Sequence, residues 1–414
     1  MNALSRLCAV FLMIFATAAT ASAQPWSVTF IIDMKARIAA KTFDPAKDSV
    51  GVRGGFAPLS WGHTTPALDA DGDGLYEVTV AFPKKPFGGQ AATYKFKVER
   101  PGADPDDGWE EGRNRLVSLD TPRQTVRRAF DEPPPPLVPH RTGTFRTHPA
   151  FASKFVGPRD VTVYLPPNYE KEPHRHYPVL YMHDGQNLFD AAHAGMEWQV
   201  DETAERLIRS GAIGPLIVVG IDNTEARREE YTPTYVEFKR DDGVVLKGGG
   251  KADLYGRFLV EELKPFIDHT YRTRPDASTT ALGGASHGGL VSLYLGLIKY
   301  PNVFGTILAV SPTAWWDNEV ILKMINALPK KTRQQIWVDI GTGEEEHEVA
   351  SARHLRDTLA AKGWKPGKDL AYTEAEGAQH DELAWGERVE PMLRWMNPFL
   401  LRQEKAEQRR DDLD

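Results

Sequence analysis

A serine set among small residues is the first group in this sequence that could do chemistry. Residues 282–290 read LGGASHGGL, with Ser286 at the centre of a G-x-S-x-G pattern from Gly284 to Gly288. Glycines at these positions let a strand and the following helix approach closely, while the serine is strained and exposed at the turn. The pattern is typical of a serine nucleophile, but it also arises by chance in glycine-rich loops, so supporting groups are needed.

A serine at its ordinary pKa is a poor nucleophile, so it needs a base, and the base needs an orienting acid. After such a turn the acid comes first along the chain and the histidine second. His380 lies in a polar, turn-like segment at 376–382, ahead of a helical C-terminal stretch, whereas His347 lies in an acidic run. We predict that His380 is the base and that His347 is solvated.

The acid is expected directly after the strand-like run at 336–340, because the sequence there continues as Gly-Thr-Gly into three glutamates. We predict Glu344 as the acid. Three alternatives stay open: Glu345, Glu346 and Asp339. A solvated loop would also explain the glutamates, and Asp339 is expected inside the strand.

Acyl transfer also needs two backbone N–H groups that face the developing oxyanion. One is expected from His287, directly after the nucleophile, and the other from the loop that follows an early strand. That loop is residues 183–187, after the apolar run 178–182. We predict the N–H of Gln186 as the second donor.

The elements around these residues predict an α/β fold. Continuous apolar runs occur at 161–165, 177–182, 216–221, 307–310 and 336–340, separated by amphipathic stretches such as 255–267 and 350–361. Runs of this kind are typical of strands covered on both faces. We therefore expect a domain with a mainly parallel sheet over 141–402.

The residues before it follow another pattern. Short alternating runs at 28–32, 76–80 and 94–98 are separated by Gly, Pro and Asp clusters, which favours an all-β sandwich over 24–130. Four consecutive prolines within 131–140 predict a stiff linker. The charged residues 403–414 are expected to form a solvated tail.

The chain has 414 residues, a formal net charge of −7 and one cysteine. The charge gives no basic face for nucleic acid. Residues 1–23 combine Arg6, a short apolar run and an A-x-A site, which predicts a cleaved export signal that carries Cys8 away. We expect a periplasmic or secreted protein without disulfides or a membrane span.

Four segments together resemble the putative-esterase family of α/β-hydrolases, which includes esterase D, siderophore esterases and feruloyl esterases. They read YPVLYMHDGQNLFD, GGASHGGL, SPTAWW and GAQHDELAW. The resemblance covers about 145–400 and implies the α/β-hydrolase fold, with Ser286 as nucleophile, His380 as base and Glu344 in the acid position. The siderophore-esterase-like subgroup can use a weak or displaced acid.

The same resemblance suggests a substrate pocket. Asp184 belongs to the Asp-Gly-Gln-Asn run, and the Trp315-Trp316 pair follows the strand at 307–310, at the sheet edge where open α/β folds bind ligands. The predicted substrate-binding residues are Asp184, Trp198, Trp315 and Trp316. The alternative for the tryptophans is ordinary core packing.

Residues 24–130 resemble a starch-binding, family 20-type carbohydrate-binding module. In such modules two tryptophans stack on sugar rings while a lysine and an asparagine bind hydroxyl groups. The resemblance assigns these roles to Trp61, Trp109, Lys95 and Asn114. The alternative is that the tryptophans are core residues and that this domain docks on the hydrolase.

No cofactor or metal site is predicted. Residues 69–74, DADGDG, match the start of a calcium loop, but position 12 is Val80 instead of the bidentate glutamate. A tight acidic turn is the better interpretation.

The sequence therefore predicts an exported serine carboxylic-ester hydrolase that forms an acyl-enzyme. Its expected partner is a small-molecule ester, either an acylated carbohydrate or a siderophore-like ester, and an α-glucan or other glycan is a candidate for the N-terminal domain. Two alternatives are an acyltransferase with a sugar acceptor and a non-catalytic glycan-binding protein.

Overall fold

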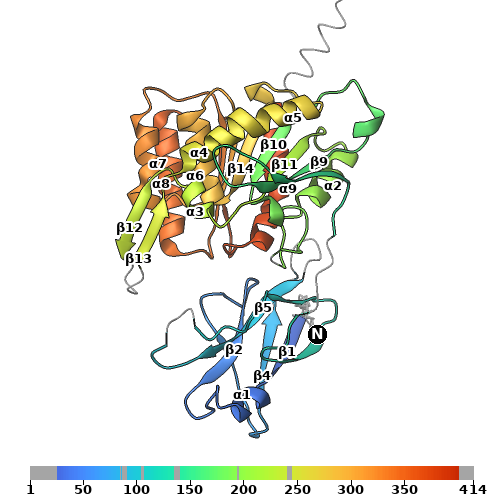
Figure 1. Ribbon diagram of the computed structural model, residues 1–414, viewed down its shortest axis with the longest axis vertical. Coiled ribbons are helices and arrows are strands. Elements are labelled where there is room, and N and C mark those ends of the chain that lie inside the picture. Colours follow the sequence, from blue (N-terminus) through green and yellow to red (C-terminus); the bar gives the residue numbers. More distant parts are fainter. Residues whose placement is uncertain are drawn as a thin grey trace, which may run out of the picture.

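The computed structural model describes residues 26–83, 85, 91–103, 107–134, 140–193, 195–239 and 245–400. The predicted signal (1–23), residues 135–139 of the predicted linker and the charged tail (403–414) lie outside the described residues. We refer to 26–134 as the N-terminal region and to 140–400 as the α/β region. Figure 1 shows them as two bodies.

The α/β region is built on an eight-stranded mixed sheet with the order β17-β16-β15-β14-β10-β11-β9-β8. Neighbouring strands from β17 to β11 are parallel, whereas β9 pairs antiparallel with both β11 and β8. The strands are β8 (Thr144–Phe151), β9 (Arg159–Leu165), β10 (Val179–His183), β11 (Ile217–Ile221), β14 (Thr280–Ser286), β15 (Thr306–Pro312), β16 (Gln335–Gly341) and β17 (Leu370–Ala375). Every apolar run predicted as a strand in this region overlaps one of them, although the runs 177–182 and 216–221 begin one or two residues before their strands.

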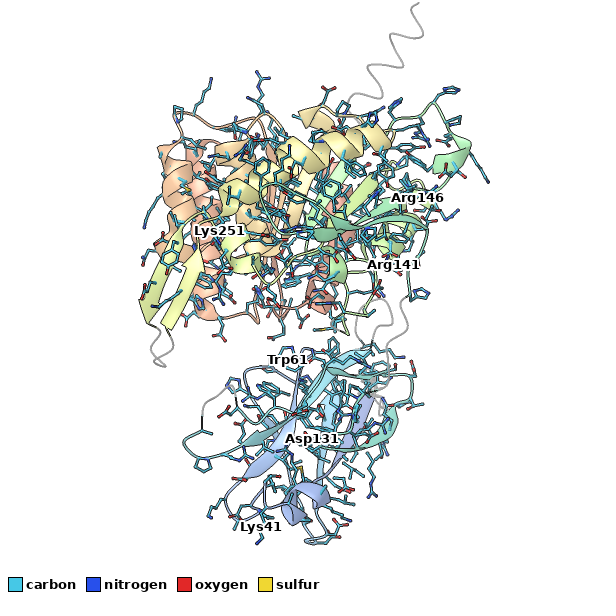
Figure 2. The ribbon with its side chains drawn as sticks, in the orientation of Figure 1. Lys41, Trp61, Asp131, Arg141, Arg146 and Lys251 are labelled. Carbon is cyan, nitrogen blue, oxygen red and sulfur yellow. The ribbon has the colours of Figure 1, made fainter. Side chains whose placement is uncertain are left out.

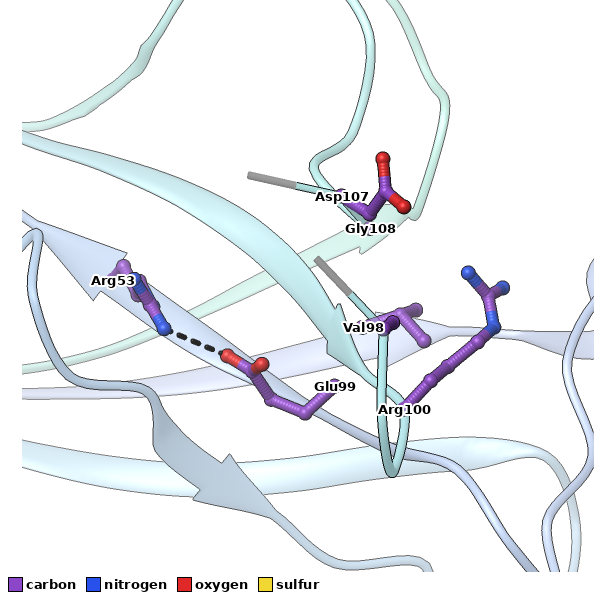
Figure 3. A pocket seen from close by; sticks show the side chains of 7 residues that line it. Arg53, Val98, Glu99, Arg100, Asp107 and Gly108 are labelled. Carbon is purple, nitrogen blue, oxygen red and sulfur yellow. Dashed lines mark hydrogen bonds and ion pairs between the residues drawn. The ribbon is translucent and has the colours of Figure 1, made fainter. Parts of the chain in front are cut away.

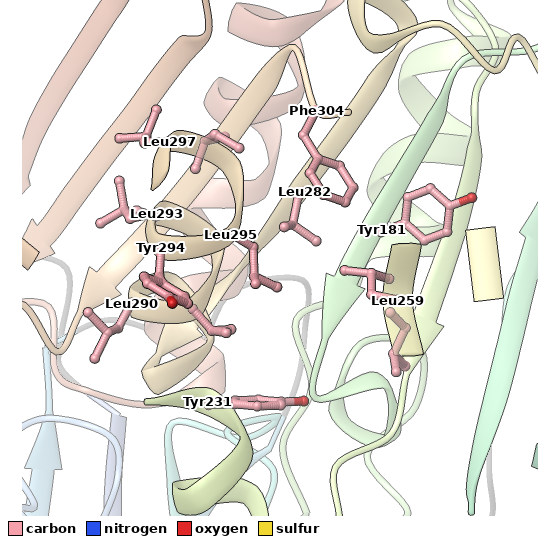
Figure 4. Close-up of a cluster of buried hydrophobic side chains, with 14 of the residues drawn as sticks. Tyr181, Tyr231, Leu259, Leu282, Leu290, Leu293, Tyr294, Leu295, Leu297 and Phe304 are labelled. Atoms are coloured by element: carbon pink, nitrogen blue, oxygen red, sulfur yellow. The ribbon is translucent and has the colours of Figure 1, made fainter. Parts of the chain in front are cut away.

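Helices cover both faces of this sheet (Figure 1). One face packs on α2 (Val200–Arg209) and α9 (Glu382–Leu400) through a buried cluster that includes Leu207, Trp385 and Met392. The other face packs on the remaining helices of this region through a larger cluster, part of which Figure 4 shows around Leu282 and Leu290. These helices are α3 (Arg227–Tyr231), α4 (Ala252–Arg257), α5 (Lys264–Thr270), α6 (His287–Leu293), α7 (Trp316–Ala327) and α8 (Glu346–Lys362). Covering both faces explains why the strands are apolar at nearly every position.

Shorter elements complete this region. Two π-helical segments, Phe258–Leu263 and Tyr294–Lys299, continue α4 and α6. Single 3-10 turns occupy Tyr169–Lys171, Gly185–Asn187 and Ala277–Thr279. The sequence analysis did not predict the hairpin of β12 (Tyr235–Lys239) and β13 (Val245–Gly249). No helix among the described residues combines the length and the apolar character that crossing a bilayer requires.

The N-terminal region contains a three-stranded sheet, β4-β1-β7, and a four-stranded sheet, β3-β2-β5-β6. Buried residues of both sheets, such as Phe30 and Phe96, belong to one hydrophobic cluster. The elements are β1 (Trp26–Asp33), α1 (Lys35–Ala39), β2 (Ser49–Gly54), β3 (Thr65–Ala67), β4 (Leu75–Phe82), β5 (Ala92–Glu99), β6 (Arg115–Val117) and β7 (Arg123–Ala129). The short helix α1 was not predicted.

Two residues of the α/β region complete the core of the N-terminal region. Met196 and Leu383 belong to its hydrophobic cluster and are 5% and 2% exposed. The Thr93 hydroxyl lies 3.2 Å from the Met196 sulfur. Leu383 lies three residues after His380, so the N-terminal region packs beside the segment that carries this histidine.

Candidate active site

Ser286 stands at a sharp turn between the central strand β14 and helix α6. Its backbone has φ 58° and ψ −124°, a left-handed conformation that is rare for a residue with a side chain. A Cβ on Gly284 would lie 3.0 Å from Cβ of His183, and one on Gly288 would lie 3.3 Å from the same atom. A Cβ on Gly284 would also lie 3.2 Å from the backbone of Gly288, so the two glycines let β14, α6 and the neighbouring strand β10, which carries His183, approach closely at the Ser286 turn.

His380 and Glu344 form a hydrogen-bonded pair. Nδ1 of His380 lies 2.7 Å from Oε2 of Glu344, whose side chain is 0% exposed. The other oxygen, Oε1, accepts hydrogen bonds from the Ser311 hydroxyl at 2.5 Å and from the Gly341 N–H at 2.9 Å. Because both oxygens have partners, the carboxylate is fixed in orientation and so is the imidazole ring.

The pair raises the pKa of the histidine and lowers that of the acid. Burial lowers the pKa of His380, but the hydrogen bond and charge of Glu344, with Glu348, outweigh it, so the pKa lies above 6.5. Burial raises the pKa of Glu344, but His380, Ser311 and the Gly341 N–H outweigh it, so the pKa lies below 4.5. This pair can therefore hold a proton on the imidazole while Glu344 stays ionised.

The other candidate acids are engaged elsewhere. Glu345 is the N-cap of α8, in a capping box with Glu348, and Glu346 is the exposed first helical residue. Asp339 lies inside β16, where Oδ1 is 3.1 Å from Nε of Arg388 and Oδ2 accepts the Trp337 indole N–H at 2.6 Å. Of the four acids considered, the structure brings Glu344 to His380.

The remaining histidines after Ser286 also have other neighbours. The ring of His347 lies 5.3 Å from that of Trp315, edge to face, and the side chain is exposed. His354, which the sequence analysis did not weigh, has Nδ1 2.7 Å from Glu319. Among the described residues, the hydrogen bonds, ion pairs and ring contacts of these two histidines do not reach the Ser286 turn.

The Ser286 hydroxyl has its hydrogen-bond contact with Thr313. The two oxygens are 3.2 Å apart, and the Thr313 hydroxyl also lies 2.9 Å from Nδ1 of His287. Burial, with Arg227 and Arg228 nearby, lowers the pKa of His287 to about 3, so its ring is neutral at pH 7. The hydrogen bonds between described residues do not include one from Ser286 to His380; such bonds are often long without substrate.

The loop after β10 lies at the same sheet edge as the Ser286 turn. A Cβ on Gly185 would lie 2.6 Å from backbone atoms of Gly220 and Ile221, so only glycine fits. Gln186, the next residue, accepts the N–H of Asn223 on its side-chain Oε1 at 3.1 Å. His287 is the first residue of α6, where the helix itself leaves N–H groups without partners. Both predicted oxyanion donors therefore belong to fixed backbone at strand ends.

Asp184 is not open to a ligand. It is 9% exposed, and Arg227 donates to its two oxygens at 2.7 and 2.8 Å while the Asn223 amide donates at 2.6 Å. Burial raises the pKa of Asp184, but these partners outweigh it and hold it below 3.8. The carboxylate therefore fixes the loop that carries Gln186, which differs from the predicted substrate contact.

The predicted pocket tryptophans differ in burial. Trp198 is 2% exposed and packs against Trp385, with ring centroids 5.4 Å apart. Trp316 is also 2% exposed and donates its indole N–H to the Thr234 carbonyl at 3.2 Å. Trp315 is half-buried. The core alternative fits Trp198 and Trp316, and Trp315 alone keeps an open side.

In the N-terminal region, Trp61 and Trp109 do not form a flat platform. Their ring centroids are 6.1 Å apart and the planes are tilted by 57°. Arg53 and Lys97 lie over the Trp109 ring at 5.2 and 4.9 Å. Figure 2 shows Trp61 at the end of this region that faces the α/β region. Lys95 and Asn114 are half-buried, and sugar binding by these four residues stays a prediction.

A small pocket of about 160 Å³ lies nearby (Figure 3). Its walls include Arg53, Glu99, Arg100 and Asp107, and Arg53 donates to Glu99 at 2.8 Å. The predicted sugar-binding residues are not among those that line it. No aromatic side chain lines this pocket, so it offers no stacking surface for a sugar.

Sequence reasoning missed three residues that complete the site. Thr313 contacts Ser286, Ser311 contacts Glu344, and Arg388 donates to the Ser311 hydroxyl at 2.8 Å. Ser311 and Thr313 stand at the end of the apolar run 307–310, in the SPTAWW segment, and that position was a usable signal. Arg388 lies inside α9, and nothing in the sequence around it indicated a role in the site.

Comparison with known proteins places the chain in a family. The sequence profile of the family described as "Putative esterase" matches residues 153–396, more than half of the chain. YbbA of Bacillus subtilis (strain 168) is 26% identical over 248 residues, which cover 58% of this chain and 93% of YbbA. The ferri-bacillibactin esterase BesA of the same organism is 31% identical over 221 residues, covering 49% of this chain and 73% of BesA.

A solved structure supports the fold. The enterobactin esterase FES from Shigella flexneri, crystallised in the presence of enterobactin, aligns with a TM-score of 0.58 and 17% identity, covering 84% of this chain and 87% of FES. The 84% of this chain that aligns is more than the α/β region alone contains, so the alignment includes part of the N-terminal region. At this identity the likeness shows an α/β-hydrolase type of fold. The chain therefore belongs to the putative-esterase family and is a carboxylic ester hydrolase.

Proposed function

We propose that this protein hydrolyses carboxylic esters through an acyl-enzyme on Ser286, with His380 as the base and Glu344 as the acid. The observation that carries the proposal is the 2.7 Å contact between His380 and Glu344, on a chain whose Ser286 stands at a strained strand–helix turn. A serine nucleophile needs such an oriented base.

The proposed reaction begins when Oγ of Ser286 attacks the ester carbonyl carbon and Nε2 of His380 takes the hydroxyl proton. The N–H groups of Gln186 and His287 stabilise the negative oxygen of the tetrahedral intermediate. The C–O bond to the leaving alcohol then breaks, and His380 returns the proton to that oxygen. Water repeats the sequence on the acyl-enzyme, releases the acid and restores Ser286.

Glu344 acts through His380. Its ionised carboxylate stabilises the imidazolium that forms in each half-reaction, and its contact with Nδ1 leaves Nε2 as the nitrogen that exchanges the proton. Ser311 and the Gly341 N–H keep the carboxylate in this orientation. Thr313 holds the Ser286 hydroxyl before substrate binds.

We propose a siderophore-like ester as substrate. The support is the likeness to BesA, named a ferri-bacillibactin esterase, and to the fold of FES. An acylated carbohydrate is the second candidate, with the N-terminal region acting as a β-sandwich module. The proposed place of action is outside the cytoplasm, on the basis of the signal-like residues 1–23.

The mechanism is tested by intact mass after incubation with a fluorophosphonate, using the wild type and Ser286→Ala. We expect one adduct on the wild type, none on the variant, and loss of ester turnover in the variant with an unchanged circular dichroism spectrum. Turnover retained by Ser286→Ala would disprove the assignment of the nucleophile.

The substrate is tested separately by product analysis with a catecholate trilactone, an acetylated xylan and a feruloylated arabinoxylan. A kcat/KM for the trilactone at least tenfold above the others supports the proposal. Preference for either polysaccharide ester would replace it, and recovery of an acylated sugar acceptor would indicate acyl transfer.

A further inference from the structure

Three side-chain clusters in the described residues could hold a metal ion. The first, Glu344, Glu348 and His380, belongs to the candidate active site. The second is the acidic turn of Asp69, Asp71 and Asp73, and the third combines Glu197, Asp201 and Glu202 at the start of α2. The last two differ in how their oxygens are satisfied.

The acidic turn is satisfied by its own backbone. Asp69 accepts the N–H groups of Gly72, Asp73 and Gly74, and Asp71 and Asp73 each accept a further N–H. Asp71 and Asp73 are exposed. The backbone hydrogen bonds of this tight turn explain why its carboxylates lie together.

The cluster at the start of α2 is buried. Glu197 is 6% exposed, Asp201 is 0% exposed, and the Glu202 side chain is 25% exposed. One carboxylate oxygen from each residue lies within 4.8 Å of the other two. Acidic residues in a first helical turn are favoured by the helix dipole, but that effect does not explain three carboxylates turned together away from water.

A second observation points to a ligand. Oδ1 of Asp201 and Oε2 of Glu202 are fully buried, and among the described residues no N–H or hydroxyl group donates to them. Burial and a hydrogen bond with Glu202 raise the pKa of Asp201 to about 9, so without a cation the two carboxyl groups share a proton. The opposite oxygens are used: Oδ2 of Asp201 accepts the Thr142 N–H at 2.6 Å, and Oε1 of Glu202 accepts the Thr142 hydroxyl at 3.1 Å. A buried carboxylate oxygen needs a donor or a cation.

The positive groups near the cluster are either engaged with another carboxylate or exposed. Arg141 is engaged with Asp190, at 2.6 Å. His140 approaches Glu202 at 3.6 Å, but its side chain is 80% exposed. Asp190, 7% exposed at its side chain, adds another negative charge to this part of the molecule.

We propose that Glu197, Asp201 and Glu202 bind one calcium ion that has a structural role. Carboxylate oxygens are the ligands that Ca²⁺ prefers, at about 2.3–2.6 Å, so two of them on one ion lie up to about 5 Å apart. The oxygens of the cluster lie within 4.8 Å of one another, so one ion can bind all three residues. Ca²⁺ accepts an irregular set of protein oxygens, whereas Mg²⁺ demands a near-octahedral set and usually keeps several waters. Two of the carboxylate oxygens already accept hydrogen bonds from Thr142, so the three residues offer about four oxygens to the ion, and the exposed side of Glu202 admits water for the remaining positions.

The bound ion would join three segments. Thr142 belongs to the start of the α/β region, Glu197 follows Met196 in the loop that contacts the N-terminal region, and Asp201 lies in the first turn of α2. Calcium would therefore stabilise the part of the α/β region on which the N-terminal region packs. This role is independent of the ester chemistry at Ser286.

The test is the thermal unfolding of the full-length protein in EDTA, in CaCl₂ and in MgCl₂, with calcium stoichiometry from equilibrium dialysis. A ligand that binds only the folded state raises the unfolding temperature. We expect millimolar Ca²⁺ to raise it by about 4 °C or more over EDTA, with one ion bound per chain. Mg²⁺ should give less than half of that rise.

Two variants locate the site, and Asp71→Asn in the exposed acidic turn is the matched control. Asp201→Asn and the half-exposed Glu202→Gln should both lose the calcium response and the bound ion, while Asp71→Asn keeps them. No calcium response in the wild type, or a response kept by both cluster variants, would overturn the proposal. A response lost in Asp71→Asn would place the ion at the turn, and an equal response to Mg²⁺ would overturn the choice of calcium.

Discussion

The hydroxyl oxygens of Ser286 and Thr313 lie 3.2 Å apart. Thr313 contacts the neutral ring of His287 at 2.9 Å, so its hydroxyl connects the proposed nucleophile with a group that carries no charge at pH 7. The backbone supports the same pairing, because the Thr313 N–H donates to the Ser286 carbonyl at 3.1 Å. Thr313 is thus a positioning residue for the Ser286 side chain.

Replacing Thr313 by valine keeps its shape and removes the hydroxyl. A neutral hydrogen bond contributes about 1 kcal/mol, so we expect kcat/KM to fall about fivefold. Thr313→Ser, which keeps the hydroxyl, should retain most of the activity. Steady-state kinetics on a chromogenic ester measure both, and equal losses in the two variants would exclude a role for the hydroxyl.

Changing Glu344 to glutamine removes the charge beside His380. We expect kcat to fall about 10²–10⁴-fold, as for other oriented-base systems. The base acts when neutral, so activity rises as pH passes the pKa of His380. Glu344 raises that pKa above 6.5, and the acid limb of the kcat/KM profile should therefore move to lower pH in the variant. A limb at the wild-type pH would show that the carboxylate does not control His380.

Gly185→Ala tests the oxyanion donors without changing a polar group. The added Cβ would lie 2.6 Å from the backbone of Gly220 and Ile221, so the loop that carries Gln186 must move. Loss of one such donor costs about 10²–10³-fold in kcat. We expect a fall of this order, with KM changed less. Gly157→Ala is the control, because its Cβ would meet no atom within 4 Å; a similar loss there would refute the steric explanation.

Asp339→Asn tests the buried ion pair beneath the site. It leaves Arg388, 6% exposed at its side chain, beside an uncharged partner. Removing one member of a buried pair destabilises a protein by about 3–5 kcal/mol, and we expect a loss at the lower end because asparagine keeps the volume. Urea unfolding measures it. Glu170→Gln, in the exposed pair with Arg146, should leave the midpoint unchanged.

The sheet was predictable because its strands are apolar on both faces, and this pattern does not depend on distant contacts. Ser286 was predictable because the G-x-S-x-G pattern follows a strand-like run. His380 was predictable because it lies in a polar segment between the last strand-like run and the C-terminal helix. Among the acids, the sequence left four open. Separating Glu344 from Asp339 required the side-chain directions at the end of β16, and these depend on Arg388 and Ser311, which are far away in sequence.

The tryptophans show a different limit. The sequence around Trp198 and Trp316 does not distinguish a tryptophan in a pocket wall from one in the core. Trp198 is placed in the core by its contact with Trp385 of α9, and Trp316 by its hydrogen bond to the Thr234 carbonyl. The cluster of Glu197, Asp201 and Glu202 was overlooked for a related reason. In the sequence these residues look like the polar first turn of an ordinary helix. Their contact with Thr142, which is distant in sequence, becomes visible only in the structure.

The shared core of Met196, Leu383 and the N-terminal strands has a practical consequence for anyone who divides this protein. A chain cut at the proline run would leave both side chains facing water, one beside the buried acidic cluster and the other three residues from His380. Such a fragment would expose apolar surface, would tend to aggregate and would have low activity, and none of these effects would depend on ligand binding by the N-terminal region. The loss of activity on truncation would then be mistaken for evidence that the N-terminal region recognises the substrate.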